Sequence, residues 1–324
     1  MMLGGEPWWR ATRRRLCSQI WGASTIPSTV ATRTHANYNG SIEATYASSV
    51  PAECDHVDRL VASRPRTAAG SIAHLIYPSA EPNGRCAIVH GGHSITYYDE
   101  STRLLQMVSA HLTAGTAVLG MCMPTDGVHT SPLVLDLEAG GTTSISNHDF
   151  SAIEADGVHS WRYFVEPVIQ MLNYLDSIEA PFSFVDMTGI SGGGWTTDMA
   201  SAVDRRIRRS APVFGSVPLG MRPPGNAGDW EQRPERQWWD VLSPRDYEAA
   251  YALGCVDLGR SRLHVVGDED PVFPVVSVHA ELDAMAERID ARIRGTHSVR
   301  IDSTTNEHEC SDETIAAVAS FFAA

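Results

Sequence analysis

Hydrophobic and polar positions follow two different patterns along the chain from about residue 71 onward, one typical of strands and one typical of helices. Short apolar runs predict buried strands at 72–77, 85–90, 116–122, 184–190, 210–215, 262–267 and 297–301. Apolar residues spaced three and four apart predict helices at 101–112, 159–175 and 275–289, with a closing helix around 315–322. Strands that alternate with helices indicate an α/β fold, in which helices flank a mostly parallel central sheet on both faces.

The same pattern suggests how the chain is organised. Residues 1–65 show little periodicity and are expected to form an N-terminal extension, and residues 66–324 are expected to form one domain. Residues 123–157 are polar and rich in Gly, so we expect a long loop there. Residues 216–260 contain more Pro, Gly and Trp than a strand-to-strand connection requires, so we expect an insertion or lid-like segment near the functional site.

Composition narrows the range of functions. The net charge of −14 and the pI near 5.3 disfavour a nucleic-acid partner, which would need a basic surface. No apolar run approaches the roughly 20 residues that span a bilayer. All 25 basic side chains are arginine, which excludes lysine Schiff-base chemistry and Ser-Lys dyads. No secretory signal is recognisable, so a cytoplasmic location is expected; the pairing of the six cysteines and the oligomeric state stay open.

The most informative stretch lies around Ser191. The residues Gly189-Ile190-Ser191-Gly192-Gly193 fit the pattern Gly-x-Ser-x-Gly, and they follow an apolar run and precede a predicted helix at 196–203. A tight strand-to-helix turn holds the serine in a strained conformation, so glycine is needed two residues to either side. The motif predicts an exposed nucleophilic hydroxyl above the sheet edge.

A serine nucleophile needs a base, and the base needs a carboxylate that fixes its tautomer. The strand at 262–267 is followed by a turn that carries Asp268 and Asp270. The strand ending at Ile301 is followed by a loop that carries His308, whereas His297 stands at a strand start and fits the role poorly. The order Ser, Asp, His after successive strands resembles the α/β-hydrolase superfamily over about residues 66–324.

The resemblance implies the roles of these residues. In the family, the acid stands three residues after a glycine and shortly before a Val or Phe that is followed by Pro. Asp270 matches this description, and Asp268 is the alternative. His308 matches the family histidine by its place before the last helix. The segment Val89-His90-Gly91-Gly92-His93 is similar to the His-Gly-Gly-Gly motif of esterases and lipases, with His93 at the third glycine. The amides of Gly92, His93 and Gly192 are therefore expected to form the oxyanion hole, and the His93 ring is expected to line the pocket.

We therefore expect a serine hydrolase that cleaves a small-molecule carboxylic ester through an acyl-enzyme, without a metal or cofactor. Trp195 and Tyr97 are candidate substrate contacts, although packing explains such aromatic residues better. A peptidase, thioesterase or acyltransferase would use the same residues. The alternative from another class is a non-catalytic hydrolase-fold module that binds a ligand or partner.

Overall fold

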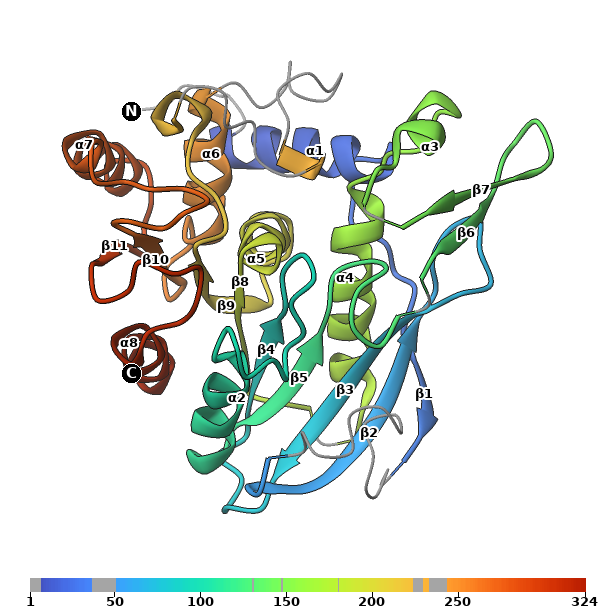
Figure 1. The fold of residues 1–324 in the computed structure, drawn as a ribbon, viewed down its shortest axis with the longest axis horizontal. Helices are drawn as coiled ribbons and strands as arrows, with labels where there is room; N and C mark the ends of the chain where they lie inside the picture. The colour runs from blue at the N-terminus through green and yellow to red at the C-terminus, as the bar shows by residue number, and fades with distance from the viewer. Residues whose placement is uncertain are drawn as a thin grey trace.

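The structure is a computed structural model that describes residues 7–36, 51–129, 131–146, 148–179, 181–223, 230–232 and 244–324. Its centre is a nine-stranded sheet in the order β1-β2-β3-β5-β4-β8-β9-β10-β11 (Figure 1). Six neighbouring strands run parallel: β5 (Ala117–Met121), β4 (Arg85–His90), β8 (Phe184–Ile190), β9 (Ile207–Val213), β10 (Ser261–Gly267) and β11 (Thr296–Asp302). The predicted α/β fold with a mostly parallel sheet is confirmed.

The remaining three strands extend the sheet on one side. β3 (Ser71–Pro78) pairs antiparallel with β5, β2 (Cys54–Ala62) pairs antiparallel with β3, and β1 (Thr32–His35) pairs antiparallel with β2. The sheet thus begins at residue 32, well before the domain boundary that the sequence suggested at residue 66. Polar residues such as Asp58 and Arg59 interrupt the apolar positions of β2, so its periodicity is weak although Leu60 and Ala62 have no exposed surface.

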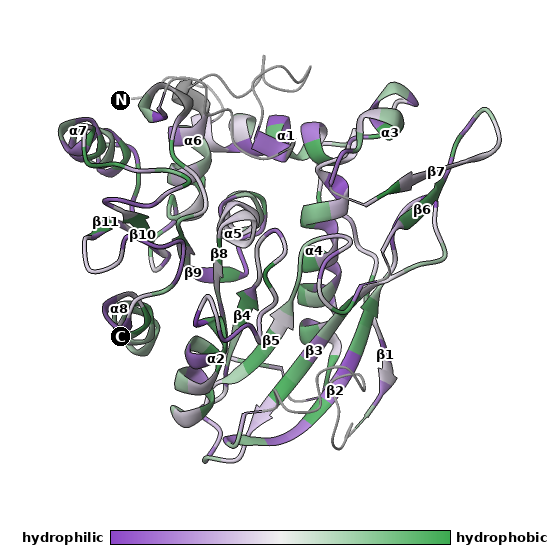
Figure 2. Cartoon of the chain, viewed as in Figure 1, coloured by the Kyte–Doolittle hydropathy of each residue, from purple (hydrophilic) through white to green (hydrophobic). Residues whose placement is uncertain are grey.

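Helices cover both faces of the sheet and create two hydrophobic clusters. Residues of α1 (Trp8–Trp21), α4 (Arg162–Ser177), α5 (Gly192–Val203), α6 (Pro244–Gly254) and α7 (His279–Asp290) belong to the larger cluster. The smaller cluster joins α2 (Leu104–Thr113) to α8 (Asp312–Ala323). Figure 2 shows hydrophobic residues concentrated along the strands between these layers. None of the described helices has the length and apolar character that crossing a membrane requires.

Two expected loops contain regular structure. Within 123–157, β6 (Leu133–Asp136) and β7 (Thr142–Ile145) form a two-stranded sheet of their own, and α3 (Ser151–Ala155) follows. Strands of four residues give too few positions for a period of two to be visible in the sequence. Within 216–260, α6 is the crossover helix between β9 and β10, and two short 3₁₀ turns, Leu219–Met221 and Trp230–Gln232, precede it. Residues 224–229 and 233–243 of that expected insertion, among them Trp238 and Trp239, lie outside the described residues.

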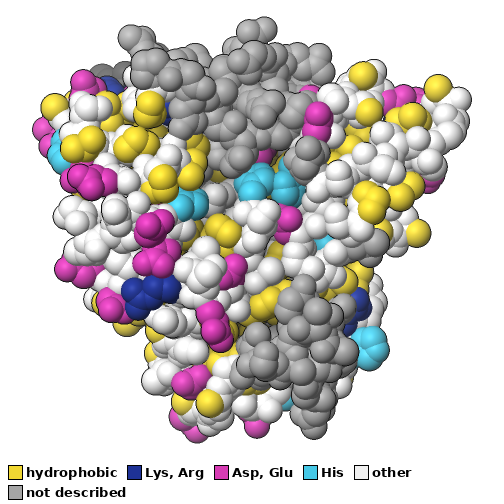
Figure 3. All heavy atoms as spheres, viewed as in Figure 1, with side chains coloured by type: hydrophobic (Ala, Val, Ile, Leu, Met, Phe, Trp, Pro, Cys, Tyr) yellow, Lys and Arg dark blue, Asp and Glu magenta, His cyan; other side chains and the backbone are white. Residues whose placement is uncertain are grey.

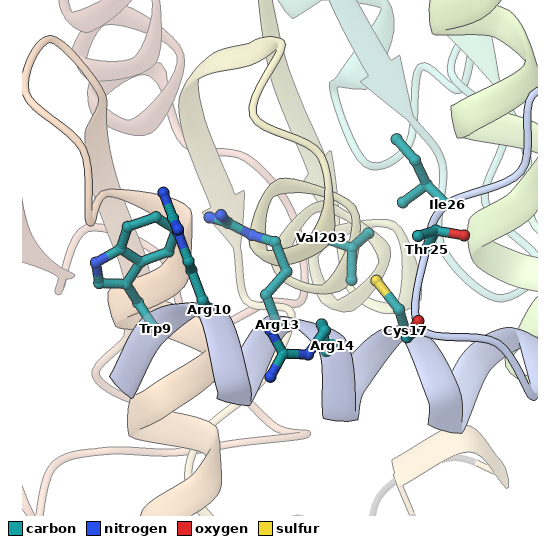
Figure 4. Close-up of a pocket in the computed structure, with 9 residues that line it drawn as sticks. Trp9, Arg10, Arg13, Arg14, Cys17, Thr25, Ile26 and Val203 are labelled. Carbon is teal, nitrogen blue, oxygen red and sulfur yellow. The ribbon is translucent and has the colours of Figure 1, made fainter. Parts of the chain in front are cut away.

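Helix α1 is part of the domain rather than a separate arm. Its side chains Leu16, Cys17 and Ile20 are buried in the larger cluster, and α1 packs across α4, α5 and α6 (Figure 1). A pocket of about 350 Å³ lies between α1 and Val203 at the end of α5, with Arg13 and Ile26 among the side chains that line it (Figure 4). Cys17 and the other five cysteines are free thiols.

Candidate active site

The carboxyl ends of four parallel strands bring the predicted catalytic residues to one edge of the sheet. In the β8–β9–β10–β11 register, Ile190 pairs with Val213, Val213 with Val265, and Gly267 with Asp302. The segments after these strands carry Ser191, Phe214, Asp270 and His308. Loops that are far apart in sequence meet here because parallel strands share one carboxyl edge.

Ser191 sits at the sharp turn between β8 and α5. Its backbone has φ 56° and ψ −127°, a conformation that is costly for a residue with a side chain. Its N–H donates to the Val213 carbonyl at 3.0 Å, and its carbonyl accepts from the Trp195 N–H at 3.0 Å. A Cβ at Gly193 would lie 2.2 Å from the His90 carbonyl oxygen, so only glycine fits there. The residue pattern around the serine thus produces the strained strand–turn–helix that it predicts.

Asp270 and His308 contact each other. Asp270 Oδ2 lies 2.6 Å from His308 Nδ1, while Asp270 Oδ1 accepts hydrogen bonds from the Val272 and Phe273 N–H groups at 2.7 and 2.6 Å. Only 1% of Asp270 is exposed. The alternative acid, Asp268, instead pairs with His279 at 2.7 Å. The geometry therefore favours Asp270 over Asp268 as the partner of His308.

The second ring nitrogen of His308, Nε2, is not engaged by Asp270. His308 Nε2 is buried and makes no hydrogen bond to any residue that the structure describes. The ring of Phe214 lies 6.0 Å from the His308 ring between centroids, and Phe214 follows β9, the strand beside β8. In the neutral tautomer whose Nδ1–H donates to Asp270, Nε2 carries the lone pair that a base needs.

The loop after β4 lies against the serine turn. A Cβ at Gly92 would stand 2.6 Å from Ser191 Cβ and 3.2 Å from the Gly192 nitrogen. A Cβ at Gly192 would stand 2.6 Å from His93 Cε1 and 2.6 Å from the Met123 methyl carbon. The structure thus places the backbone of Gly92 beside Ser191 and Gly192, and it places the His93 ring against Gly192.

A buried polar network surrounds the His93 ring, and the sequence analysis did not find it. His93 Nε2 lies 3.2 Å from the Glu231 carboxylate, which has no exposed surface, and the His93 and His148 rings make an edge contact with centroids 4.5 Å apart. His148 Nε2 lies 3.3 Å from Asp126, which accepts from the Ser94 N–H at 3.0 Å. Histidine and acidic side chains meet near the middle of the face drawn in Figure 3.

Burial shifts the pKa values of two members of this network. It lowers the pKa of His148, and the neighbouring His93 lowers that pKa further. It also raises the pKa of Asp126, against the opposing effect of His148. No signal in the sequence links Glu231 to His93, because the two residues are 138 positions apart and Glu231 belongs to an irregular segment.

His90 and the two candidate substrate contacts, Tyr97 and Trp195, are structural in this arrangement. His90 is buried and bonded to the Gly91 carbonyl at 2.7 Å, and burial lowers its pKa to about 4, so the ring stays neutral. Tyr97 is 1% exposed and its hydroxyl lies 2.8 Å from His74 Nδ1. Trp195 has no exposed surface and packs on Trp161 with ring centroids 5.4 Å apart. Tyr97 and Trp195 therefore offer a substrate no surface in this structure.

The described residues include no group of three His, Cys, Asp or Glu side chains close enough together to hold a metal ion. The polar groups near Ser191 are instead arranged in pairs, such as His93 with Glu231 and His308 with Asp270.

No protein-family model and no curated protein matches the chain, whereas many solved structures share its fold. An acetyl xylan esterase from a Paenibacillus species is 16% identical, covers 100% of this chain and 96% of its own, and has a TM-score of 0.57. Acetyl xylan esterase 1 from a Thermoanaerobacterium species is 15% identical, covers 98% and 94%, and has a TM-score of 0.56. A cold-adapted esterase from an Arctic intertidal metagenomic library is 12% identical, covers 82% and 93%, and has a TM-score of 0.51.

These similarities extend over nearly the whole of both chains for the two acetyl xylan esterases. At such low identity they establish the shared architecture. The chain has the α/β-hydrolase fold, as its Ser, Asp, His order suggested.

Proposed function

We propose that the protein is a serine hydrolase that cleaves a carboxylic ester through an acyl-enzyme, with Ser191 as nucleophile, His308 as base and Asp270 as the acid that orients it. The observation that carries the proposal is the contact between Asp270 and His308 at the sheet edge where Ser191 occupies its strained turn. The structural similarity to several esterases supports an ester as substrate.

The chemistry follows from these positions. His308 Nε2 takes the proton of the Ser191 hydroxyl while the oxygen attacks the ester carbonyl, and Asp270 stabilises the imidazolium that forms. The amides of Gly92, His93 and Gly192 donate to the carbonyl oxygen as it becomes negative, and one such donor contributes about 3 kcal/mol in the transition state. His308 then returns the proton to the leaving alcohol. Water then attacks the acyl-enzyme. His308 takes the proton of the water and gives it to the Ser191 oxygen as the carboxylic acid leaves.

The same residues could act on other acyl groups. A peptidase, thioesterase or acyltransferase needs no different nucleophile or base. Two of the similar structures are acetyl xylan esterases, so acetylated sugars belong among the first substrates to test. A non-catalytic binding module would not need the costly backbone of Ser191 or a buried acid held against a histidine.

The test combines covalent labelling with turnover. The protein should react with a fluorophosphonate probe and should hydrolyse p-nitrophenyl esters or acetylated sugars. Ser191→Ala should lose both, with turnover lower by about 10⁶-fold. Ser303→Ala, in the exposed loop before His308, is the matched control and should behave as the unaltered protein. Absence of labelling in the folded protein would support the binding module, and turnover of peptides alone would contradict the assignment to esters.

A further inference from the structure

A pocket outside the proposed active site lies at the opposite side of the sheet. It has a volume of about 450 Å³ and is formed by β1, the end of β2 and the turn that leads to β3. In the strand order, β3 and β5 separate β2 from β4 and β8, the strands that precede the oxyanion loop and Ser191. A volume in this range suits a small organic ligand. The pocket is lined by Thr29, Val30, Thr32, Thr34, Val61, Ser63, Arg64, Thr67, Ala68 and Gly70.

Arg64 is the unusual member of this lining. The residue is only 6% exposed, and its Nε and Nη2 are buried without a hydrogen-bond partner among the described residues. Burial lowers the pKa of Arg64 to about 10, so the guanidinium is still charged at neutral pH. The described residues that line the pocket include no Asp or Glu. A buried charge without a partner is costly, so an anion that approached it would restore much of the lost stabilisation.

Two other deeply buried arginines have a partner, which is an ion pair for Arg262 and a set of hydrogen bonds for Arg260. Arg262 has no exposed surface and lies 2.5 Å from the Asp198 carboxylate. Arg260 is 5% exposed, and its pKa is also lowered to about 10, but it donates to the backbone carbonyls of Ile207, Leu253 and Ser201 at 2.7–3.0 Å. Arg64 therefore departs from the way in which this chain pairs its buried guanidinium groups.

The rest of the lining suits a polar ligand. Five of the ten residues carry hydroxyl groups, and three of these residues, Thr29, Thr32 and Thr34, come from the segment that leads into and forms β1. Thr67 Oγ1 accepts from the Ala69 N–H at 3.1 Å, which leaves its own proton to donate. Thr34 and Ser63 already donate to the Arg59 carbonyl and to Gln170 Oε1, so Thr29, Thr32 and Thr67 supply the hydroxyl protons that remain. Hydroxyl donors beside an arginine are the groups that bind carboxylate and phosphate oxygens.

We propose that this pocket binds a small organic anion of about sugar size. Its carboxylate or phosphate group contacts Arg64, and its hydroxyl groups contact the threonine side chains. The site is separate from the proposed catalytic residues and does not depend on the proposed function.

Binding can be measured by calorimetry and by the melting temperature of the full-length protein at constant ionic strength. Gluconate tests a sugar-sized ligand with a carboxylate group, and glucose 6-phosphate tests one with a phosphate group. Glucose tests the same carbon skeleton without a charge, and inorganic phosphate tests the anion without the sugar. We expect saturable binding and a higher melting temperature with gluconate or glucose 6-phosphate, and none with glucose. Arg64→Met should weaken binding at least about tenfold, because it removes a charged hydrogen-bond donor. Arg292→Met, at an exposed position after α7, should not.

The melting temperature without ligand gives a second readout. Since Arg64 is a buried charge without a partner, Arg64→Met should melt at or above the temperature of the unaltered protein. If Arg64→Met does not fold, the absence of a partner for Arg64 is contradicted. Thr67→Val then still tests ligand binding in the pocket, and we expect its affinity to be several-fold lower. The proposal is overturned if neither organic anion binds, if Arg64→Met or Thr67→Val binds as tightly as the unaltered protein, or if Ser191→Ala abolishes binding.

Discussion

At the scale of single residues, the proposed site depends on which side chains hold His308 and His93. Asp270 contacts His308 with one carboxylate oxygen and binds two backbone N–H groups with the other, so its orientation is fixed. Glu231 contacts His93 from a position with no exposed surface. Each carboxylate therefore positions an imidazole, and each can be tested by a substitution that keeps the shape of the side chain.

Replacing Asp270 by Asn should lower kcat for ester hydrolysis by about 10⁴-fold, because an amide cannot stabilise the imidazolium or enforce the required tautomer. Steady-state kinetics with a p-nitrophenyl ester measure the effect. Asp268→Asn is the matched control, since Asp268 pairs with His279, and it should retain activity within a few-fold. If the two variants were impaired equally, Asp270 would not be the acid.

Glu231→Gln should lower kcat by about 10- to 100-fold and leave KM nearly unchanged, because the His93 ring that packs on Gly192 would lose its charged partner and the oxyanion loop would shift. The split between kcat and KM distinguishes this role from a loss of folded protein. Glu248→Gln removes a carboxylate of α6 that pairs with Arg288 of α7, and it should leave both constants unchanged. A rise in KM alone would show that Glu231 acts on substrate binding instead.

At the scale of elements, two backbone segments must approach more closely than side chains allow. The loop after β4 and the turn after β8 meet where a Cβ at Gly92 would lie 2.6 Å from Ser191 Cβ and 2.7 Å from the Ile190 carbonyl oxygen. The neighbouring strands pair in register, Val89 with Thr188 and His90 with Gly189, so the two segments leave the sheet side by side.

Gly92→Ala should therefore lower kcat/KM by about 10²-fold, because the added methyl group pushes the oxyanion amides away from the serine. Activity and melting temperature are measured together. Gly220→Ala is the control, since a Cβ there meets no atom within 4 Å. Full activity of Gly92→Ala would mean that the loop is not held against Ser191.

At the scale of the whole molecule, described residues of the expected N-terminal extension contribute to the core. Leu16 and Ile20 of α1 and Leu60 of β2 are at most 3% exposed. Burying side chains of this kind stabilises a protein by roughly 2 kcal/mol each, so these three alone approach the total stability of an ordinary domain.

Deleting residues 1–65 should leave a protein that aggregates or does not melt cooperatively, because β3 would become an exposed edge and the α1 side of the core would open. Circular dichroism melting and size-exclusion chromatography detect this. Deleting residues 1–6 alone removes no part of α1 and should preserve both profiles. A stable, active protein without residues 1–65 would restore the boundary suggested by the sequence.

Buried histidines should make the protein sensitive to acid. Burial lowers the pKa of His74, His90 and His111 to about 4 and that of His297 to about 3. The unfolded chain binds these protons at about pH 6.5, so stability is full above pH 6.5 and falls toward pH 4, by up to about 3 kcal/mol for each histidine.

Urea unfolding between pH 7.5 and pH 4.5 measures this slope. His111→Gln should reduce the slope, because it removes one group that binds a proton only in the unfolded chain. His35→Gln, at an exposed position of β1, is the control and should leave the slope unchanged. A free energy of unfolding that did not vary across this range would contradict the burial of neutral histidines.

The sequence alone determined the α/β alternation, the parallel strands, and the serine turn, because these depend on residues that are neighbours along the chain. The positions of Asp270 and His308 followed from the order of strands. Only the tertiary structure revealed that β1, β2 and α1 belong to the domain, that Glu231 and His148 surround His93, and that Arg64 is buried without a partner. These features depend on contacts between distant segments, and neither periodicity nor local motifs encode which distant side chains will meet.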